Sequence, residues 1–167
     1  MIMKSIYAVV LCVLLSTRDA FTFCGNNEQI DDLKTSLIIH ESTFIILATS
    51  SAVPIPGTVL TLMEVLASGS FGIRLQKILG EMKGSLNKVH KDYPICSEIL
   101  EKTITAAAVI KSTDVGLALV ALIPGVNLAL IPPRIATSLG AIVLIRDGLE
   151  HWESNNCQYA TGRDCDI

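Results

Sequence analysis

Apolar residues recur at every third or fourth position through four stretches of the chain, which predicts four α-helices and no strands. The expected helices cover about residues 27–51, 58–91, 94–122 and 133–152. Pro54 and Pro56 are expected to end the first helix, since proline removes a backbone donor and clashes with the preceding turn. Pro94 and Pro133 are expected to open the third and fourth helices, because proline is well suited to a first helical position. The fold class is therefore predicted as all-α.

The apolar stripe of each helix is expected to form the core. Glu41 is a polar residue within the first stripe. The predicted core consists of Ile30, Leu33, Leu37, Phe44, Leu62, Leu66, Ile73, Leu79, Met82, Ile99, Ile104, Ile110, Leu119, Leu122, Leu128, Ile135, Leu139, Ile142 and Ile145.

The tripeptide Ile-Pro-Gly occurs at 55–57 and again at 123–125, which is a spacing of 68 residues. At the same spacing Leu60 aligns with Leu128, and Gly80 aligns with Gly148. One interpretation is an internal duplication, with half-repeats at about 24–93 and 94–165. The other is chance similarity between leucine-rich helices. Under either, short connections between four helices predict an up-down-up-down bundle of two helical hairpins.

Residues 1–20 have the pattern of a secretory signal peptide. Lys4 precedes an uninterrupted apolar run at 6–15, which is too short to span a bilayer, and Ala20 is a suitable last residue. An uncleaved signal anchor is the alternative. We expect a secreted, extracellular protein in which residues 21–167 form a single helical domain.

Four cysteines remain after residue 20, and an even number in a secreted chain predicts disulfides. The bundle topology brings Cys24, Cys96, Cys157 and Cys165 to one end of the molecule. The favoured pairs are Cys96–Cys157 and Cys24–Cys165, with a local Cys157–Cys165 bond as the alternative. The spacing does not indicate a zinc site, because there is no Cys-x-x-Cys pair.

Charge argues against several classes of partner. Residues 21–167 hold 11 basic and 15 acidic residues once Lys4, Arg18 and Asp19 are removed, so their net charge is −4. No basic run is present, so binding to nucleic acid is not expected. Attraction to anionic lipid by charge alone is not expected either.

Catalytic and metal-binding motifs are not found in the sequence, so we expect no enzyme, no cofactor and no metal. Asp147 and His151 lie one helical turn apart, and the favoured interpretation is a surface ion pair. Trp152 is expected to pack over the end of the core, with an anchor at a membrane interface as the alternative.

The composition is unusually apolar, with 50% hydrophobic and 17% charged residues, and residues 115–145 contain one charge, Arg134. A large apolar surface usually marks a binding site. Three functions remain open: a carrier that holds a lipid-like ligand between its helices, a structural or protein-interaction module, and a membrane-active defence or toxin-like protein that uses a hydrophobic hairpin at 115–145. Membrane contact is the least favoured. The carrier's ligand would contact Leu62, Leu66, Leu119, Leu122, Leu128, Ile135 and Leu139.

Overall fold

A computed structural model describes residues 26–50, 57–89, 94–123 and 125–160. The described elements are helices α2 (Asn27–Ser50), α3 (Gly57–Val89), α4 (Pro94–Val120) and α5 (Asn127–Ser154), and the short 3-10 helix η1 (Cys157–Ala160). These helices pack against one another, and the described ranges contain no strand, so the prediction of an all-helical bundle is confirmed. The predicted signal peptide, Cys24 and Cys165 lie outside the described residues.

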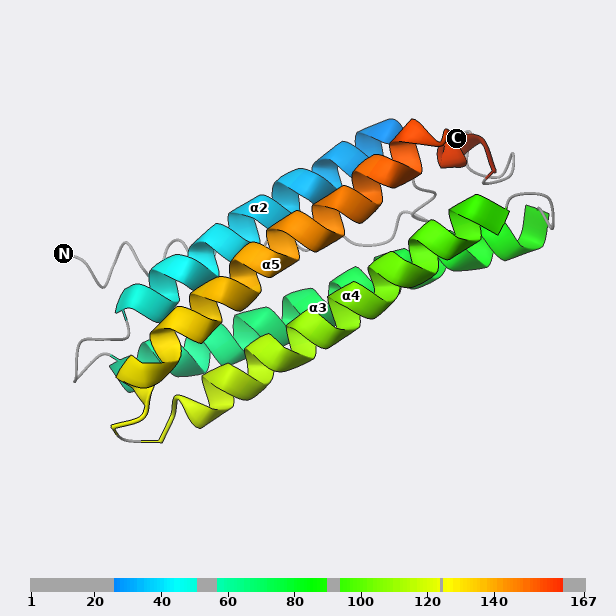
Figure 1. Cartoon of the computed structure of the whole chain (residues 1–167). Coiled ribbons are helices and arrows are strands. Elements are labelled where there is room, and N and C mark those ends of the chain that lie inside the picture. The colour runs from blue at the N-terminus through cyan, green and yellow to red at the C-terminus, as the bar shows by residue number, and fades with distance from the viewer. Residues whose placement is uncertain (1–25, 51–56, 90–93, 124, 161–167) are drawn as a thin grey trace.

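The four long helices lie side by side along one direction (Figure 1). Helix α4 packs against both α3 and α5, while α2 packs more extensively against α5 than against α3. At one end of the bundle the start of α2 lies beside the end of α5, and η1 packs against α5 there. At the opposite end the start of α5 lies near the end of α4.

Local signals explain where α2 and α4 begin. The side chain of Asn26 caps α2, because its Oδ1 accepts a hydrogen bond of 2.9 Å from the backbone N–H of Gln29. Helix α4 begins at Pro94 as predicted.

The predicted start of the fourth helix at Pro133 is wrong. Helix α5 begins at Asn127 and contains both Pro132 and Pro133. Each proline removes one backbone donor near the start of the helix. The Nη1 of Arg134 donates to Oδ1 of Asn127 at 2.8 Å, which ties the first turn to the residues after the prolines.

A disulfide joins the start of α4 to η1. Cys96 and Cys157, the pair favoured from the sequence, are bonded with a Cα–Cα distance of 5.6 Å and a sequence separation of 61. Both residues are buried. We call this end of the bundle the disulfide end.

The main apolar core fills the half of the bundle nearest the disulfide and extends into the adjoining part of the other half. Its members are Ile30, Leu33, Leu37, Phe71, Leu75, Leu79, Met82, Leu86, Cys96, Leu100, Ala107, Ala141, Ile145, Leu149, Trp152 and Cys157. Trp152 is fully buried over the end of this core, as expected. A second, smaller cluster contains Phe44, Leu47, Leu60 and Ala67.

The predicted core is wrong at six positions in the other half of the bundle. Their side chains are 50–75% exposed, and they are Leu62, Leu66, Ile73, Leu119, Leu128 and Leu139. The physical reason is that this half has apolar residues on both faces of each helix, so periodicity does not identify the buried face. Charged residues occupy much of the interior there instead.

Removing the disulfide should lower stability without changing the fold. The bond closes a long loop, and the variant C96A/C157A should therefore be less stable by about 2–4 kcal/mol in urea unfolding. Its far-ultraviolet circular dichroism should remain helical. An unchanged unfolding midpoint would show that this bond does not form in the native protein.

Candidate functional site

The half of the bundle opposite the disulfide exposes no charged side chain in its described residues. It comprises residues 35–50, 57–73, 103–123 and 125–145. These ranges contain only five charged residues, and every one is buried: Glu41, Glu64, Lys111, Asp114 and Arg134. We call this half the charge-free end.

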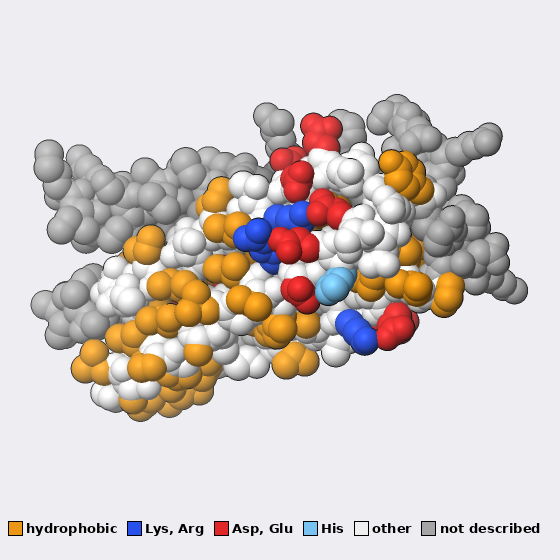
Figure 2. All heavy atoms as spheres, turned by 45° about the horizontal axis from the view of Figure 1, so that its top comes forward, with side chains coloured by type: hydrophobic (Ala, Val, Ile, Leu, Met, Phe, Trp, Pro, Cys, Tyr) orange, Lys and Arg blue, Asp and Glu red, His pale blue; other side chains and the backbone are white. Residues whose placement is uncertain are grey.

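Large apolar side chains cover the outer surface of the charge-free end. The exposed members are Ile38, Ile39 and Ile46 on α2, Val59, Leu62, Leu66 and Ile73 on α3, Val109, Leu119 and Val120 on α4, and Leu128, Leu139, Val143 and Leu144 on α5, with Ile123 just beyond α4. All four helices contribute. Figure 2 shows hydrophobic side chains gathered toward this end, whereas Lys, Arg, Asp and Glu side chains gather away from it.

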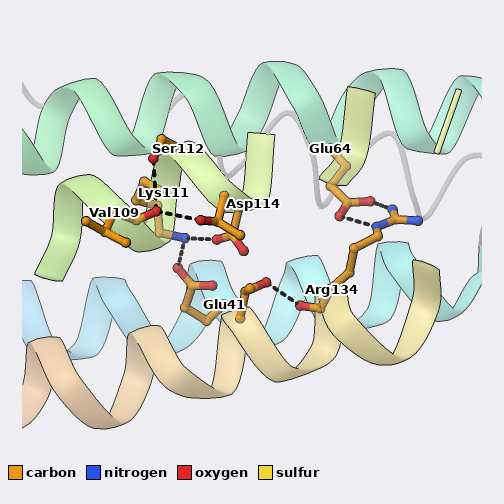
Figure 3. A network of polar contacts seen from close by, with 9 residues as sticks. Glu41, Glu64, Val109, Lys111, Ser112, Asp114 and Arg134 are labelled. Carbon is orange, nitrogen blue, oxygen red and sulfur yellow. Dashed lines mark hydrogen bonds and ion pairs between the residues drawn. The ribbon is translucent and has the colours of Figure 1, made fainter. Parts of the chain in front are cut away.

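Lys111 on α4 forms one of two charged clusters inside the charge-free end (Figure 3). Its Nζ donates to Oε1 of Glu41 on α2 and, at 2.7 Å, to Oδ2 of Asp114 one turn along α4. The same ammonium group lies 5.1 Å from the ring centre of Phe44 and 5.8 Å from that of Phe71. Carboxylates and aromatic faces therefore surround the buried positive charge, which offsets part of its desolvation.

Arg134 on α5 forms the second cluster with Glu64 on α3. Its Nε donates to Oε1 of Glu64 at 3.0 Å, and its Nη2 donates to Oε2. This two-point contact suits the planar guanidinium group and is stronger than a single bond (Figure 3). Both clusters join helices across the bundle, since α2 meets α4 in the first and α3 meets α5 in the second.

Burial shifts the protonation of two neighbouring residues on α2. Desolvation raises the pKa of Glu41 above its usual range, although the ammonium group of Lys111 and a hydrogen bond from Ser138 oppose this rise. Desolvation, with the positive charges of Lys111 and Arg74, lowers the pKa of His40 to about 4. His40 is therefore neutral at pH 7, stacked on Phe71 with ring centres 4.1 Å apart.

The residues predicted to contact a ligand do not surround an interior space. Five of the seven are at least half exposed on the outer surface, and Leu122 and Ile135 are partly buried. A groove of about 520 Å³ lies between α4 and α5 nearer the disulfide end, where Ile99 and Leu144 line it together with Lys102 and His151. It opens to solvent and contains none of the predicted contact residues.

Other candidate chemistry is weak in the described part of the chain. Asp147 and His151 are both exposed, with 3.7 Å between Oδ2 and Nε2, which is the geometry of a surface ion pair. The described residues contain no cluster of three or more His, Cys, Asp or Glu side chains that could hold a metal ion.

Sequence reasoning did not identify the partners of the two internal clusters. Glu41 was visible as a polar residue on an apolar stripe, and Arg134 as a single charge in a long apolar region. Their partners Lys111 and Glu64 each lie 70 residues away along the chain. The sequence did contain a signal for this pairing. In both pairs an acid and a base, each in an otherwise uncharged region, are separated by the same 70 residues.

Comparisons of this chain with protein-family models, with curated proteins and with solved structures give no match.

Removing one member of the Glu64–Arg134 pair should lower the free energy of unfolding more than removing both charges. R134M leaves a buried carboxylate uncompensated and should destabilise the protein by about 3–5 kcal/mol, whereas E64Q/R134M should cost less because no buried charge remains. Urea unfolding at pH 7 measures both. If the double variant were as unstable as R134M, the two side chains would not be paired in the interior.

His40 should make the protein less stable in mild acid. Its pKa is about 4 in the folded state and about 6.5 in the unfolded chain, so between these values the unfolded state binds more protons and stability falls as pH falls. Between pH 7 and 4.5 this residue should remove about 2–3 kcal/mol. The raised pKa of Glu41 acts in the opposite direction, so the histidine is isolated by comparing wild type with H40F.

In urea unfolding H40F should lose less stability than wild type over that range, because it cannot take up the proton. Equal losses in the two proteins would mean that His40 is not buried beside Lys111.

Proposed function

We propose that this protein is an extracellular, non-enzymatic helical bundle that acts on lipid bilayers by inserting its charge-free end. The observation that carries the proposal is the inverted arrangement of this end, in which every charge is inside and large apolar side chains are outside. In water such a surface is unfavourable at about 25 cal/mol per Å² of apolar area. Hydrocarbon removes that penalty and leaves the charge pairs in the interior undisturbed.

The distribution of the exposed apolar residues supports a bilayer rather than one protein partner. They occur on all four long helices, including Ile46, Leu66, Leu119 and Leu139. A protein partner usually covers one face, whereas lipid chains contact an inserted bundle from every side. Burying charge inside and exposing apolar side chains is also the usual arrangement within membranes.

The dimensions of the charge-free end support the same proposal. Its helical segments contain roughly 16 to 19 residues each, or about 25–30 Å at 1.5 Å per residue, close to the thickness of a bilayer's hydrocarbon core. By length and composition α4 and α5 could each cross a membrane. Only 28% and 22% of their most apolar windows are buried within the bundle, so they differ from ordinary core helices.

The carrier has weaker support, because the interior near its predicted contact residues holds charged clusters instead of an apolar cavity. A self-associating module would also hide the exposed apolar side chains. Self-association is therefore the alternative to membrane insertion, and vesicle flotation with native mass spectrometry distinguishes the two.

An internal duplication is part of the proposal, because buried positions repeat at a spacing of 70 residues. The pairs are 30 and 100, 33 and 103, 37 and 107, 41 and 111, 44 and 114, 48 and 118, 64 and 134, 68 and 138, 71 and 141, 75 and 145, 79 and 149, and 82 and 152. Glu41 contacts its own equivalent, Lys111, and Glu64 contacts Arg134. Two equivalent helical hairpins related by a two-fold axis along the bundle would bring such positions together. Each hairpin would then supply half of the charge-free end.

Flotation with phosphatidylcholine vesicles tests the membrane proposal, using full-length protein expressed for secretion from an oxidising compartment. Wild type should float with the vesicles and release a trapped dye. L66E and L139E place a charge on the exposed apolar surface, and each should reduce the bound fraction at least about tenfold, because a charge in hydrocarbon is costly.

I95E is the matched control, since Ile95 is similarly exposed but lies near the disulfide. It should bind like wild type. Failure of wild type to bind vesicles would contradict the proposal, as would equal loss in I95E. A lipid-free oligomer in native mass spectrometry, together with no binding, would instead favour self-association.

A further inference from the structure

A basic residue borders the charge-free end on every one of its four helices. On each helix we consider the first charged residue beyond the charge-free end, in the direction of the disulfide end. It is Lys34 on α2, Arg74 on α3, Lys102 on α4 and Arg146 on α5. The protein has more acidic than basic residues, so a border made entirely of bases is opposite to its net charge. We call these four residues the basic border.

Contacts between the helices place Arg74, Lys102 and Arg146 at a similar height along the bundle. Gln76 on α3 donates from Nε2 to the backbone oxygen of Ile104 on α4 at 3.2 Å, close in sequence to Arg74 and Lys102. Gly148 on α5 packs closely against the Thr103 side chain, close to Arg146 and Lys102. The two arginines and Lys102 therefore lie within about one helical turn of one another.

The acidic partners of Lys34, Lys102 and Arg146 lie on the side of the basic border nearer the disulfide end. Lys102 pairs with Glu98 at 2.7 Å, and Arg146 pairs with Glu150 at 2.6 Å. In both pairs the acid is one turn nearer the disulfide end, so the base is on the side of the charge-free end. Lys34 follows the same order with Asp31 at 3.3 Å.

This arrangement matches the layers of a phospholipid bilayer, in which phosphate groups lie just outside the hydrocarbon. Long basic side chains at such a boundary keep their stems in apolar surroundings and place their charge among the headgroups. The paired acids Glu98 and Glu150, set back by one turn, stay in the aqueous layer. Two further acids, Glu101 and Asp147, directly adjoin Lys102 and Arg146 on the side of the disulfide end.

We propose that the basic border binds the phosphate groups of phospholipids and fixes how deeply the charge-free end inserts. This inference rests on the proposed membrane function and adds a preference for anionic phospholipids. The attraction acts at short range, because the net negative charge of the whole protein opposes long-range attraction to an anionic surface.

Vesicle partitioning of the full-length protein in 0.15 M salt tests the inference. The two compositions are phosphatidylcholine alone and phosphatidylcholine with about a third phosphatidylglycerol. Wild type should bind the anionic vesicles more tightly. R74Q/R146Q should lose about fivefold in partitioning per charge on anionic vesicles and much less on neutral ones. R74K/R146K should keep the preference.

K83Q/K88Q is the matched control, since it removes two positive charges from α3 nearer the disulfide end. It should partition like wild type on both compositions. K102Q repeats the test at a highly exposed side chain if R74Q/R146Q loses helical circular dichroism, with an expected fivefold loss.

The two proposals fail in different ways. If wild type binds neither composition, the membrane function itself is overturned. If wild type binds both and K102Q or R74Q/R146Q keeps the full anionic preference, or if K83Q/K88Q loses as much as R74Q/R146Q, only the role of the basic border is overturned.

Discussion

Charge pairing across the inside of the bundle is the interaction on which the charge-free end depends. Two bases and three acids are removed from water there, and each would cost several kcal/mol if it were left alone. Lys111 is held by Glu41 and Asp114, and Arg134 by two bonds to Glu64. Because both clusters join helices that lie across the bundle from each other, they also fix the relative heights of the helices. Shifting one helix by a turn would separate the partners and leave buried charges unpaired.

The two ends of the molecule therefore differ in where their charged and apolar side chains lie. At the disulfide end the interior is apolar, charged pairs such as Lys83 with Glu101 lie outside, and Cys96–Cys157 adds a covalent link. At the charge-free end the interior holds two charged clusters beside buried apolar side chains such as Phe44 and Leu60, and the exterior is apolar. In the proposed insertion, one end stays in water while the other enters hydrocarbon, and the core is not rearranged. This is why we favour insertion of a preformed end over the release of a single hairpin at 115–145.

The sequence predicted the helices well, because strong periodicity and proline breaks mark them. It was wrong about the start of α5, where the contact between Asn127 and Arg134 supports a helix through two prolines. It was also wrong about part of the core, including Leu62 and Leu128, because apolar residues occur on both faces of these helices. At the charge-free end the isolated charged residues, such as Glu41 and Arg134, marked the buried face better than the apolar residues did. Pairing Glu41 with Lys111 required knowing that residues 70 apart meet across the bundle, which a single sequence with repeats read at 68 did not supply.

Carboxyl footprinting of the purified protein in aqueous buffer tests the central claim most directly, since it reports which acids are accessible to a reagent in solution. The account predicts that Glu41, Glu64 and Asp114 remain unmodified under native conditions, while the exposed Glu98 and Glu150 react readily. All five should react once the protein is unfolded in urea. Modification of Glu41 or Glu64 in the native protein as fast as that of Glu98 would contradict a charged interior, and with it the inverted charge-free end.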